Sequence, residues 1–147
     1  MSLTIHASAV LVGARAVLIR GPSGAGKSRL AFDLISAAGG CLRFARLVAD
    51  DRAEVVAAAG RLLVRPAPSL AGLIEVHGLG IRRLAYEPVA AVGLVVDLAA
   101  ADAQRLPAPE QTRAVIEGVV LARLAVAPGE AALPRVIAAL HLLESAA

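Results

Sequence analysis

The sequence predicts an α/β fold, a single domain over residues 1–147 in which a mixed β-sheet surrounds a glycine-rich loop. Three observations lead to this prediction. Short apolar runs typical of strands recur along most of the chain, only two segments have helical spacing, and a glycine-rich turn joins a strand to the first of these helices. Because the strands greatly outnumber the helices, a mixed sheet is expected rather than an all-parallel one.

The expected strands are short apolar runs that end at glycine, proline or acidic residues. They are predicted at residues 5–11, 16–19, 47–49, 73–76 and 92–98, with a hairpin over 54–64 that turns at Gly60. Helices are predicted at 27–38, which Gly39 and Gly40 stop, and at 133–144. Loops are expected at 66–72, 77–80 and 99–109, while 111–127 fits either strands or a helix.

The composition excludes several classes of protein. Hydrophobic residues make up 58% of the chain, but the longest stretch without a charged residue is Met1–Ala14, shorter than the roughly 20 residues of a spanning helix. The start has no basic region typical of a secretory signal, and the single Cys41 fits a reducing cytoplasm. The net charge of +3 comes from scattered arginines, and aromatics are 2%, which argues against nucleic-acid binding. A cytoplasmic protein that binds no membrane is expected.

The glycine-rich loop has the sequence GPSGAGKS, which fits G-x-x-x-x-G-K-[ST] at every fixed position between a strand and a helix. Its glycines leave backbone amides bare to cradle phosphates at the helix N-terminus. Lys27 can reach the β and γ phosphates, and the Ser28 hydroxyl can bind Mg²⁺. Since Lys27 is the only lysine of the chain, a chance match is disfavoured. The predicted ATP-binding residues are Gly21, Pro22, Ser23, Gly24, Ala25, Gly26, Lys27 and Ser28.

Acidic residues occur at two of the predicted strands, directly after one of them and within the other. Asp50 and Asp51 come at the carboxyl end of a strand, where open α/β sheets bind ligands. Glu75 lies in IEVHGLGI, on the polar side of an alternating strand. On the residues alone, the aspartates also fit a solvated turn and Glu75 an ordinary exposed position. By the same reasoning His6 is more often a buried core histidine, and His77 a surface one.

Four motifs in order, a histidine in the first strand followed by GPSGAGKS, LVADDR and IEVHGLGI, resemble one family over residues 5–106. The chain is similar to the catalytic domain of HPr kinase/phosphorylase, a bacterial enzyme that acts on a serine of the phosphocarrier protein HPr, in its compact alphaproteobacterial form. The resemblance implies a nucleotide-binding core like that of phosphoenolpyruvate carboxykinase. It also implies ATP and Mg²⁺ as cofactors, an HPr-like partner, control of a phosphotransferase system, and a homo-oligomer, since the family forms hexamers.

The resemblance also implies a role for individual residues. Asp51 matches the group that accepts the serine proton, and Asp50 supports the metal beside it. Arg105 matches an arginine that helps catalysis, and His6 an active-site histidine. The implied catalytic residues are His6, Lys27, Asp50, Asp51 and Arg105, and the implied magnesium ligands are Ser28 and Glu75.

The sequence departs from the family pattern at several places. Arg29 stands where the family has an acid, His77 replaces an arginine, and residues 127–130 replace a stretch linked to the reverse, phosphorylase reaction. The segment 39–46 is also longer than usual. Two alternatives therefore stay open beside the protein serine kinase. One is a regulatory nucleotide-binding module that has lost catalysis, and the other is a small-molecule phosphotransferase.

Overall fold

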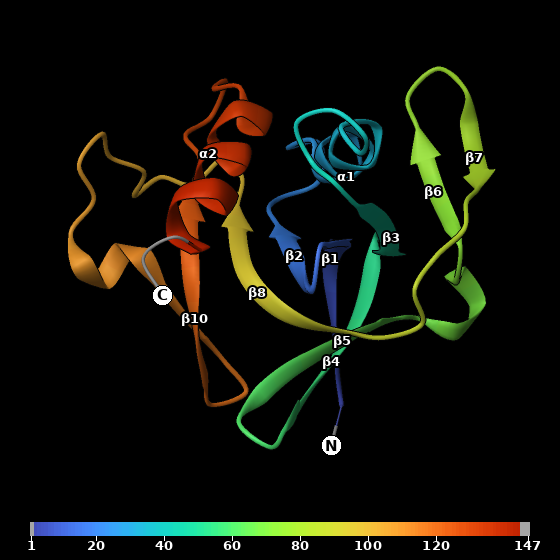
Figure 1. Ribbon diagram of the computed structural model, residues 1–147, viewed down its shortest axis with the longest axis horizontal. Helices are drawn as coiled ribbons and strands as arrows, with labels where there is room; N and C mark the ends of the chain where they lie inside the picture. The colour runs from blue at the N-terminus through green and yellow to red at the C-terminus, as the bar shows by residue number, and fades with distance from the viewer. Residues whose placement is uncertain (1, 145–147) are drawn as a thin grey trace.

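The computed structural model describes residues 2–144 as a mixed sheet with two α-helices (Figure 1). The helices are α1 (Lys27–Ser36) and α2 (Ala132–Glu144), with short 3₁₀ turns η1 (Pro68–Leu70) and η2 (Pro109–Thr112). The strands are β1 (Leu3–Val12), β2 (Arg15–Arg20), β3 (Ala45–Ala49), β4 (Arg52–Ala58), β5 (Arg61–Pro66), β6 (Leu73–Val76), β7 (Gly80–Arg83), β8 (Ala90–Asp97), β9 (Arg113–Ile116) and β10 (Val119–Ala125).

The larger sheet mixes parallel and antiparallel pairs, which confirms the predicted mixed α/β class. β1 is antiparallel to β2 and β3, while β8 is parallel to both β2 and β10. It follows that β2, β3, β8 and β10 all run in the same direction, and their carboxyl ends meet at one edge. In Figure 1 this edge lies at the top of the sheet, next to the two helices.

Two long strands join this layer to the hairpin of β4 and β5. The first residues of β1 pair with β4 and the later ones with β2, while the start of β8 pairs with β5. The hairpin turns at Gly60, as predicted, and crosses the lower part of the molecule in Figure 1.

The sheet is buried on both faces, as the apolar run of β2 shows. Val17 and Ile19 join the cluster that contains α1 and α2, while Ala16 and Leu18 join the cluster that contains β4 and β5. Neighbouring strand residues point to opposite faces, so an uninterrupted apolar run is what a strand covered on both sides requires. The helices thus cover one face and the hairpin the other.

The structure decides between the two alternatives for one segment and adds an unpredicted strand to another. The ambiguous stretch 111–127 forms the antiparallel hairpin of β9 and β10, with Glu117 and Gly118 both at positive φ in the turn. The tight loop expected at 77–80 is present as a turn over residues 77–79, and it leads into a strand that was not predicted, β7, so residues 73–83 form a separate two-stranded hairpin. Within the part of the chain that the structure describes, no helix is long and apolar enough to cross a membrane.

Candidate functional site

The glycine-rich loop runs from Gly21 to Gly26, between the end of β2 and the start of α1. Gly24 and Gly26 have φ values of 83° and 98°, which favour glycine, and Gly26 is the N-cap of α1. At Gly21 a Cβ would lie 3.1 Å from the Cβ of Leu98, so the loop packs closely against the chain that follows β8. The sequence folds in this way because glycine alone allows both the turn and this close approach.

Lys27, the first residue of α1, folds back over this loop. Its Nζ donates hydrogen bonds to the carbonyl oxygens of Gly21 at 2.8 Å and Pro22 at 3.2 Å. No carboxylate among residues 2–144 forms an ion pair with it. The ammonium therefore lies at the loop with its charge unmatched by an anion.

Asp50 is a buried carboxylate directly after β3, with 5% of its surface exposed. The Ser28 hydroxyl lies 2.7 and 2.9 Å from its two oxygens, the Ser8 hydroxyl donates at 2.6 Å, and the backbone N–H of Glu75 donates at 3.1 Å. All of these donors are neutral, and no lysine or arginine in the described residues pairs with Asp50. A buried charge without a counter-ion is unfavourable unless a cation binds beside it.

Ser8 is a site residue that the sequence reasoning missed. It lies in β1 and is completely buried, and only Ser8 and Asp50 are buried polar residues in the described chain. A hydroxyl within the otherwise apolar run of residues 7–12 is the only indication the sequence gives, because its partner lies 42 residues away.

Asp51 and Glu75 border a cavity of about 280 Å³ that also contacts Asp50. Asp51 has a φ of 68°, so the chain turns immediately after Asp50 and both aspartates face the same cavity. The side chains of Asp51 and Glu75 are exposed and have no hydrogen-bonding partner among residues 2–144. Glu75 thus occupies the polar strand position that its alternation predicted. Leu70, Leu73 and Ile81 are apolar residues that line the same cavity.

A larger open cleft of about 1360 Å³ adjoins this cavity. One wall is the glycine-rich loop with the start of α1, and others are Leu98, Ala99 and the residues 126–134 before and within α2. Asp51 and Glu75 line both spaces. A ligand in the cleft would therefore have one end at Lys27 and at these carboxylates.

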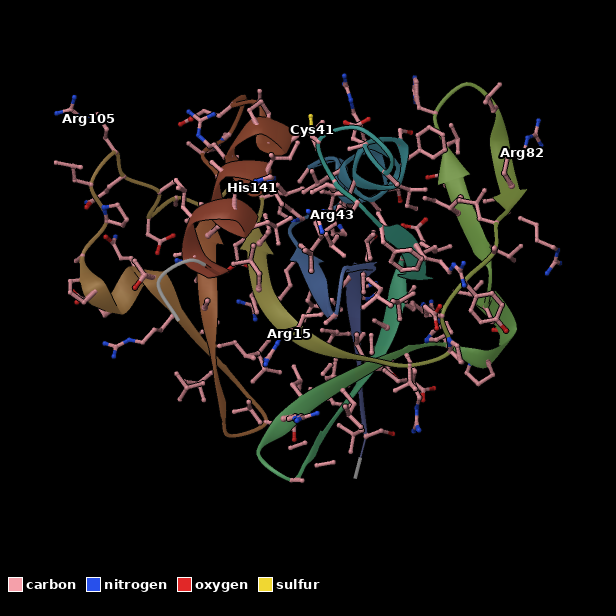
Figure 2. The ribbon with its side chains drawn as sticks, viewed as in Figure 1. Arg15, Cys41, Arg43, Arg82, Arg105 and His141 are labelled. Carbon is pink, nitrogen blue, oxygen red and sulfur yellow. The ribbon has the colours of Figure 1, made fainter. Side chains whose placement is uncertain are left out.

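His6 and Arg105 lie outside both groups of lining residues. His6 is exposed in β1 opposite Arg52, so the interpretation as a buried core histidine is wrong. The reason is that the first residues of β1 extend past β2 and pair only with β4. The next residue, Ala7, donates its N–H to the carbonyl of Asp51 at 3.2 Å, which places His6 near the aspartate turn. Figure 2 shows Arg105 on the outer part of the loop after β8, pointing away from the sheet.

The donor set fits Mg²⁺ bound together with a phosphate ligand. No three histidine, cysteine or acidic side chains in the described residues are arranged to hold a metal by themselves. Mg²⁺ prefers one or two carboxylates plus phosphate oxygens and water over a cage made only of protein ligands. This preference is matched by Asp50, whose charge is uncompensated. The Ser28 hydroxyl and the backbone N–H of Glu75 both donate hydrogen bonds to it, so the three residues lie together.

Comparisons with known proteins agree with the resemblance. The family profile described as HPr Serine kinase C-terminal domain matches residues 1–131. HPr kinase/phosphorylase of Limosilactobacillus reuteri is 42% identical over 79 residues, which cover 53% of this chain and 23% of that protein. The protein of the same name from Exiguobacterium is 46% identical over 66 residues, covering 44% and 19%. The matched stretch thus spans less than a quarter of these relatives.

A solved structure has the same fold. The Hpr(Ser) kinase/phosphatase from Coxiella burnetii superposes with a TM-score of 0.75 at 24% sequence identity, over 98% of this chain and 93% of that chain. The fold agreement therefore extends over nearly the whole chain, whereas the segments matched in the two curated relatives cover about half of it. With the family profile covering most of its length, the chain belongs to the HPr serine kinase C-terminal domain family.

Proposed function

We propose that this protein is an ATP-dependent protein serine kinase that phosphorylates an HPr-like phosphocarrier protein in the cytoplasm, and so regulates a phosphotransferase system. The observation that supports it best is the buried Asp50 next to the glycine-rich loop that carries Lys27: within the described part of the chain, Asp50 receives only neutral donors and Lys27 has no anionic partner. Mg²⁺ and a nucleotide phosphate would supply the two missing charges. The HPr partner comes from the family, whose curated members are named HPr kinase/phosphorylase.

The nucleotide would bind in the larger cleft, with its phosphates in the glycine-rich loop. The backbone amides of the glycine-rich loop and the N-terminus of α1 favour anions there. Lys27 would exchange its contacts to the loop carbonyls for the β and γ phosphates. A phosphoenolpyruvate carboxykinase type of nucleotide-binding core is part of this proposal.

Ser28 and Glu75 would hold Mg²⁺, with Asp50 supporting them. The single Ser28 proton points to Asp50, which leaves the oxygen lone pairs free for the metal. When bound, Mg²⁺ neutralises charge on the phosphate oxygens. Ser8 would keep Asp50 in place from the buried side.

Asp51 would accept the proton of the acceptor serine as its oxygen bonds to the γ phosphorus and ADP leaves. Its carboxylate suits this role because it is exposed at the cavity and makes no hydrogen bond within the described chain. The reverse, phosphorylase reaction would use Asp51 as the proton donor. His6 near the aspartate turn and Arg105 on its loop are proposed to assist, and Arg105 would have to approach the site through a change of its loop or through a second copy of the chain.

The test is phosphoryl transfer from ATP to an HPr-like protein encoded in the same genome, followed by mass spectrometry with Mg²⁺ present. We expect one phosphoryl group on a single serine, none when that serine is replaced by alanine, and none with Lys27→Ala. ATP binding without transfer to any HPr-like protein would contradict the kinase and favour a regulatory module. Transfer to small hydroxyl compounds but not to HPr would favour a small-molecule phosphotransferase.

A further inference from the structure

A cluster of four charged side chains lies beside the cleft and has no role in the proposed reaction. Asp97, the last residue of β8, accepts hydrogen bonds from Arg20 Nε at 2.8 Å, Arg20 Nη2 at 2.9 Å and Arg123 Nε at 2.6 Å. Arg123 also donates to both oxygens of Asp102, at 2.8 and 3.0 Å, and to the carbonyl of Gln111 at 3.0 Å. The Asp97 and Arg123 side chains are only 16% and 13% exposed.

This cluster connects three parallel strands at their carboxyl ends. Arg20 ends β2, Asp97 ends β8, and Arg123 lies near the end of β10. Neighbouring strands in a sheet are already joined by backbone hydrogen bonds, but Asp97 adds side-chain bonds to the strands on both of its sides. The relative position of the three strand ends is therefore fixed by charge-assisted bonds, which are stronger than neutral ones.

Each of these strand ends leads directly into a wall of the cleft. Gly21 follows Arg20 and begins the glycine-rich loop, Leu98 and Ala99 follow Asp97, and residues 126–134 come shortly after Arg123. Backbone bonds extend the connection, since Leu98 donates to the carbonyl of Arg20 and Val126 to that of Asp97, both at 2.9 Å. A shift of any strand end would change the width of the cleft.

Asp97 and Arg123 are both stabilised in their ionised form. Burial alone would raise the pKa of Asp97, but the hydrogen bonds and charges of Arg20 and Arg123 hold it below its usual value of 3.8. The hydrogen bond to Asp102 raises the pKa of Arg123 despite its partial burial, and Asp97 adds to that effect. The bonds therefore persist at neutral pH.

We propose that Asp97 is a positioning residue for nucleotide binding, because it holds Arg20 and Arg123 and thereby sets the distance between the glycine-rich loop and the opposite walls of the cleft. Asp97 lines neither space itself. It would act through the strand ends, so its loss should weaken binding of ATP rather than remove a contact to it. This inference rests on the proposed nucleotide binding.

The test compares ATP affinity by calorimetry in the parent and in Asp97→Asn, Arg123→Lys and Glu54→Gln. Asp97→Asn keeps the shape but leaves Arg20 without its anion and Arg123 with Asp102 as its remaining anion. Arg123→Lys keeps the charge but loses the planar fork that reaches both aspartates. Glu54→Gln is the control, because it also removes a carboxylate from an arginine, the single bond of 3.0 Å from Arg65, on the β4–β5 hairpin away from the cleft.

We expect Asp97→Asn to weaken ATP binding about tenfold or more, Arg123→Lys to weaken it several-fold, and Glu54→Gln to leave it unchanged. A merely structural role would lower the melting temperature of Asp97→Asn while the folded variant binds ATP as the parent does, and that result would overturn the inference. If Asp97→Asn does not fold, unchanged affinity in Arg123→Lys overturns it instead. A parent that binds no ATP would contradict the proposed function itself.

Discussion

Asp50 and Asp97 occupy equivalent places in the sheet and have opposite surroundings. Both stand at the carboxyl end of strands that run in the same direction, and both are largely buried. Asp97 accepts bonds from two arginines, whereas the donors to Asp50 among residues 2–144 are only hydroxyl and amide groups. Lys27 shows the same imbalance with the opposite sign, because it contacts only carbonyl oxygens.

The difference is one of charge compensation: the charge of Asp97 is balanced within the described chain, and the charge of Asp50 is not. Around Asp97 the charges compensate one another within the protein, which suits a scaffold. Around Asp50 the chain supplies anions and a cation that do not meet, which suits a site that a metal and phosphates complete. Residues kept unpaired in this way commonly reduce stability for the sake of function.

The largest expected effect is a loss of kcat, and it distinguishes the role of Asp51 from that of Asp50. Asp51→Asn should reduce kcat by about 10²–10⁴-fold, since a positioned base contributes that much, while ATP binding stays unchanged. The measurement is kcat at saturating ATP and Mg²⁺ with an HPr-like acceptor. A kcat within a few-fold of the parent would remove Asp51 as the base, and a loss seen only in Asp50→Asn would transfer the role to Asp50.

Lys27→Ala tests the unmatched cation. The ammonium is expected to contribute about 1.5–3 kcal/mol as a charged hydrogen-bond donor, so ATP affinity should fall by roughly 10–100-fold. The fold should persist, because this side chain contacts only carbonyl oxygens of its own loop. Calorimetry and thermal unfolding check both statements. Unchanged ATP affinity would mean that the loop does not use its lysine for phosphate.

Glu75→Gln tests the metal side of the site. The variant keeps the shape of the side chain and the backbone N–H that donates to Asp50, but it removes one carboxylate from the cavity. The Mg²⁺ concentration for half-maximal activity should rise by about tenfold, with little loss of activity at saturating metal. Ser8→Ala is expected to act in the same direction more weakly. Identical magnesium dependence in parent and Glu75→Gln would make Glu75 an ordinary exposed strand residue.

The smallest effect concerns acid stability. The pKa of Asp97 is held below 3.8 by Arg20 and Arg123 against burial, so its contribution is present above that value and is lost as the pH falls through the lower, folded-state pKa. Asp97→Asn should therefore lose less stability than the parent between about pH 5 and pH 3. Urea unfolding at both pH values is the check, with Glu54→Gln as the control. Equal losses in parent and variant would show that the two arginines do not stabilise the charge.

Much of the site could be predicted from local sequence, because its central parts are local. The spacing of GPSGAGKS predicts the loop and places Lys27 and Ser28, and the end of an apolar strand predicts the position of Asp50. The alternation around Glu75 predicts its exposed position. These features depend on neighbours within a few residues, which a sequence displays directly.

The rest depends on which strands become neighbours. Ser8 reaches Asp50 because β1 pairs with β3, and Arg123 reaches Asp97 because β10 joins β8. Neither strand pairing can be predicted from the amino-acid composition or from the spacing of apolar residues. The exposure of His6 also follows from pairing, and the positive φ of Asp51 is uncommon even for aspartate, which adopts it more often than most residues do.

The most direct test of the comparison is the free energy of unfolding of Asp50→Asn and Asp97→Asn, measured by urea at pH 7 with a chelator and without nucleotide. We predict that Asp97→Asn is less stable than the parent by about 2 kcal/mol, because Arg20 loses its anion and Arg123 keeps only Asp102. We predict that Asp50→Asn is at least as stable as the parent, because it removes an uncompensated buried charge. A loss of stability in Asp50→Asn as large as that in Asp97→Asn would contradict the claim that only the Asp50 site awaits a cation.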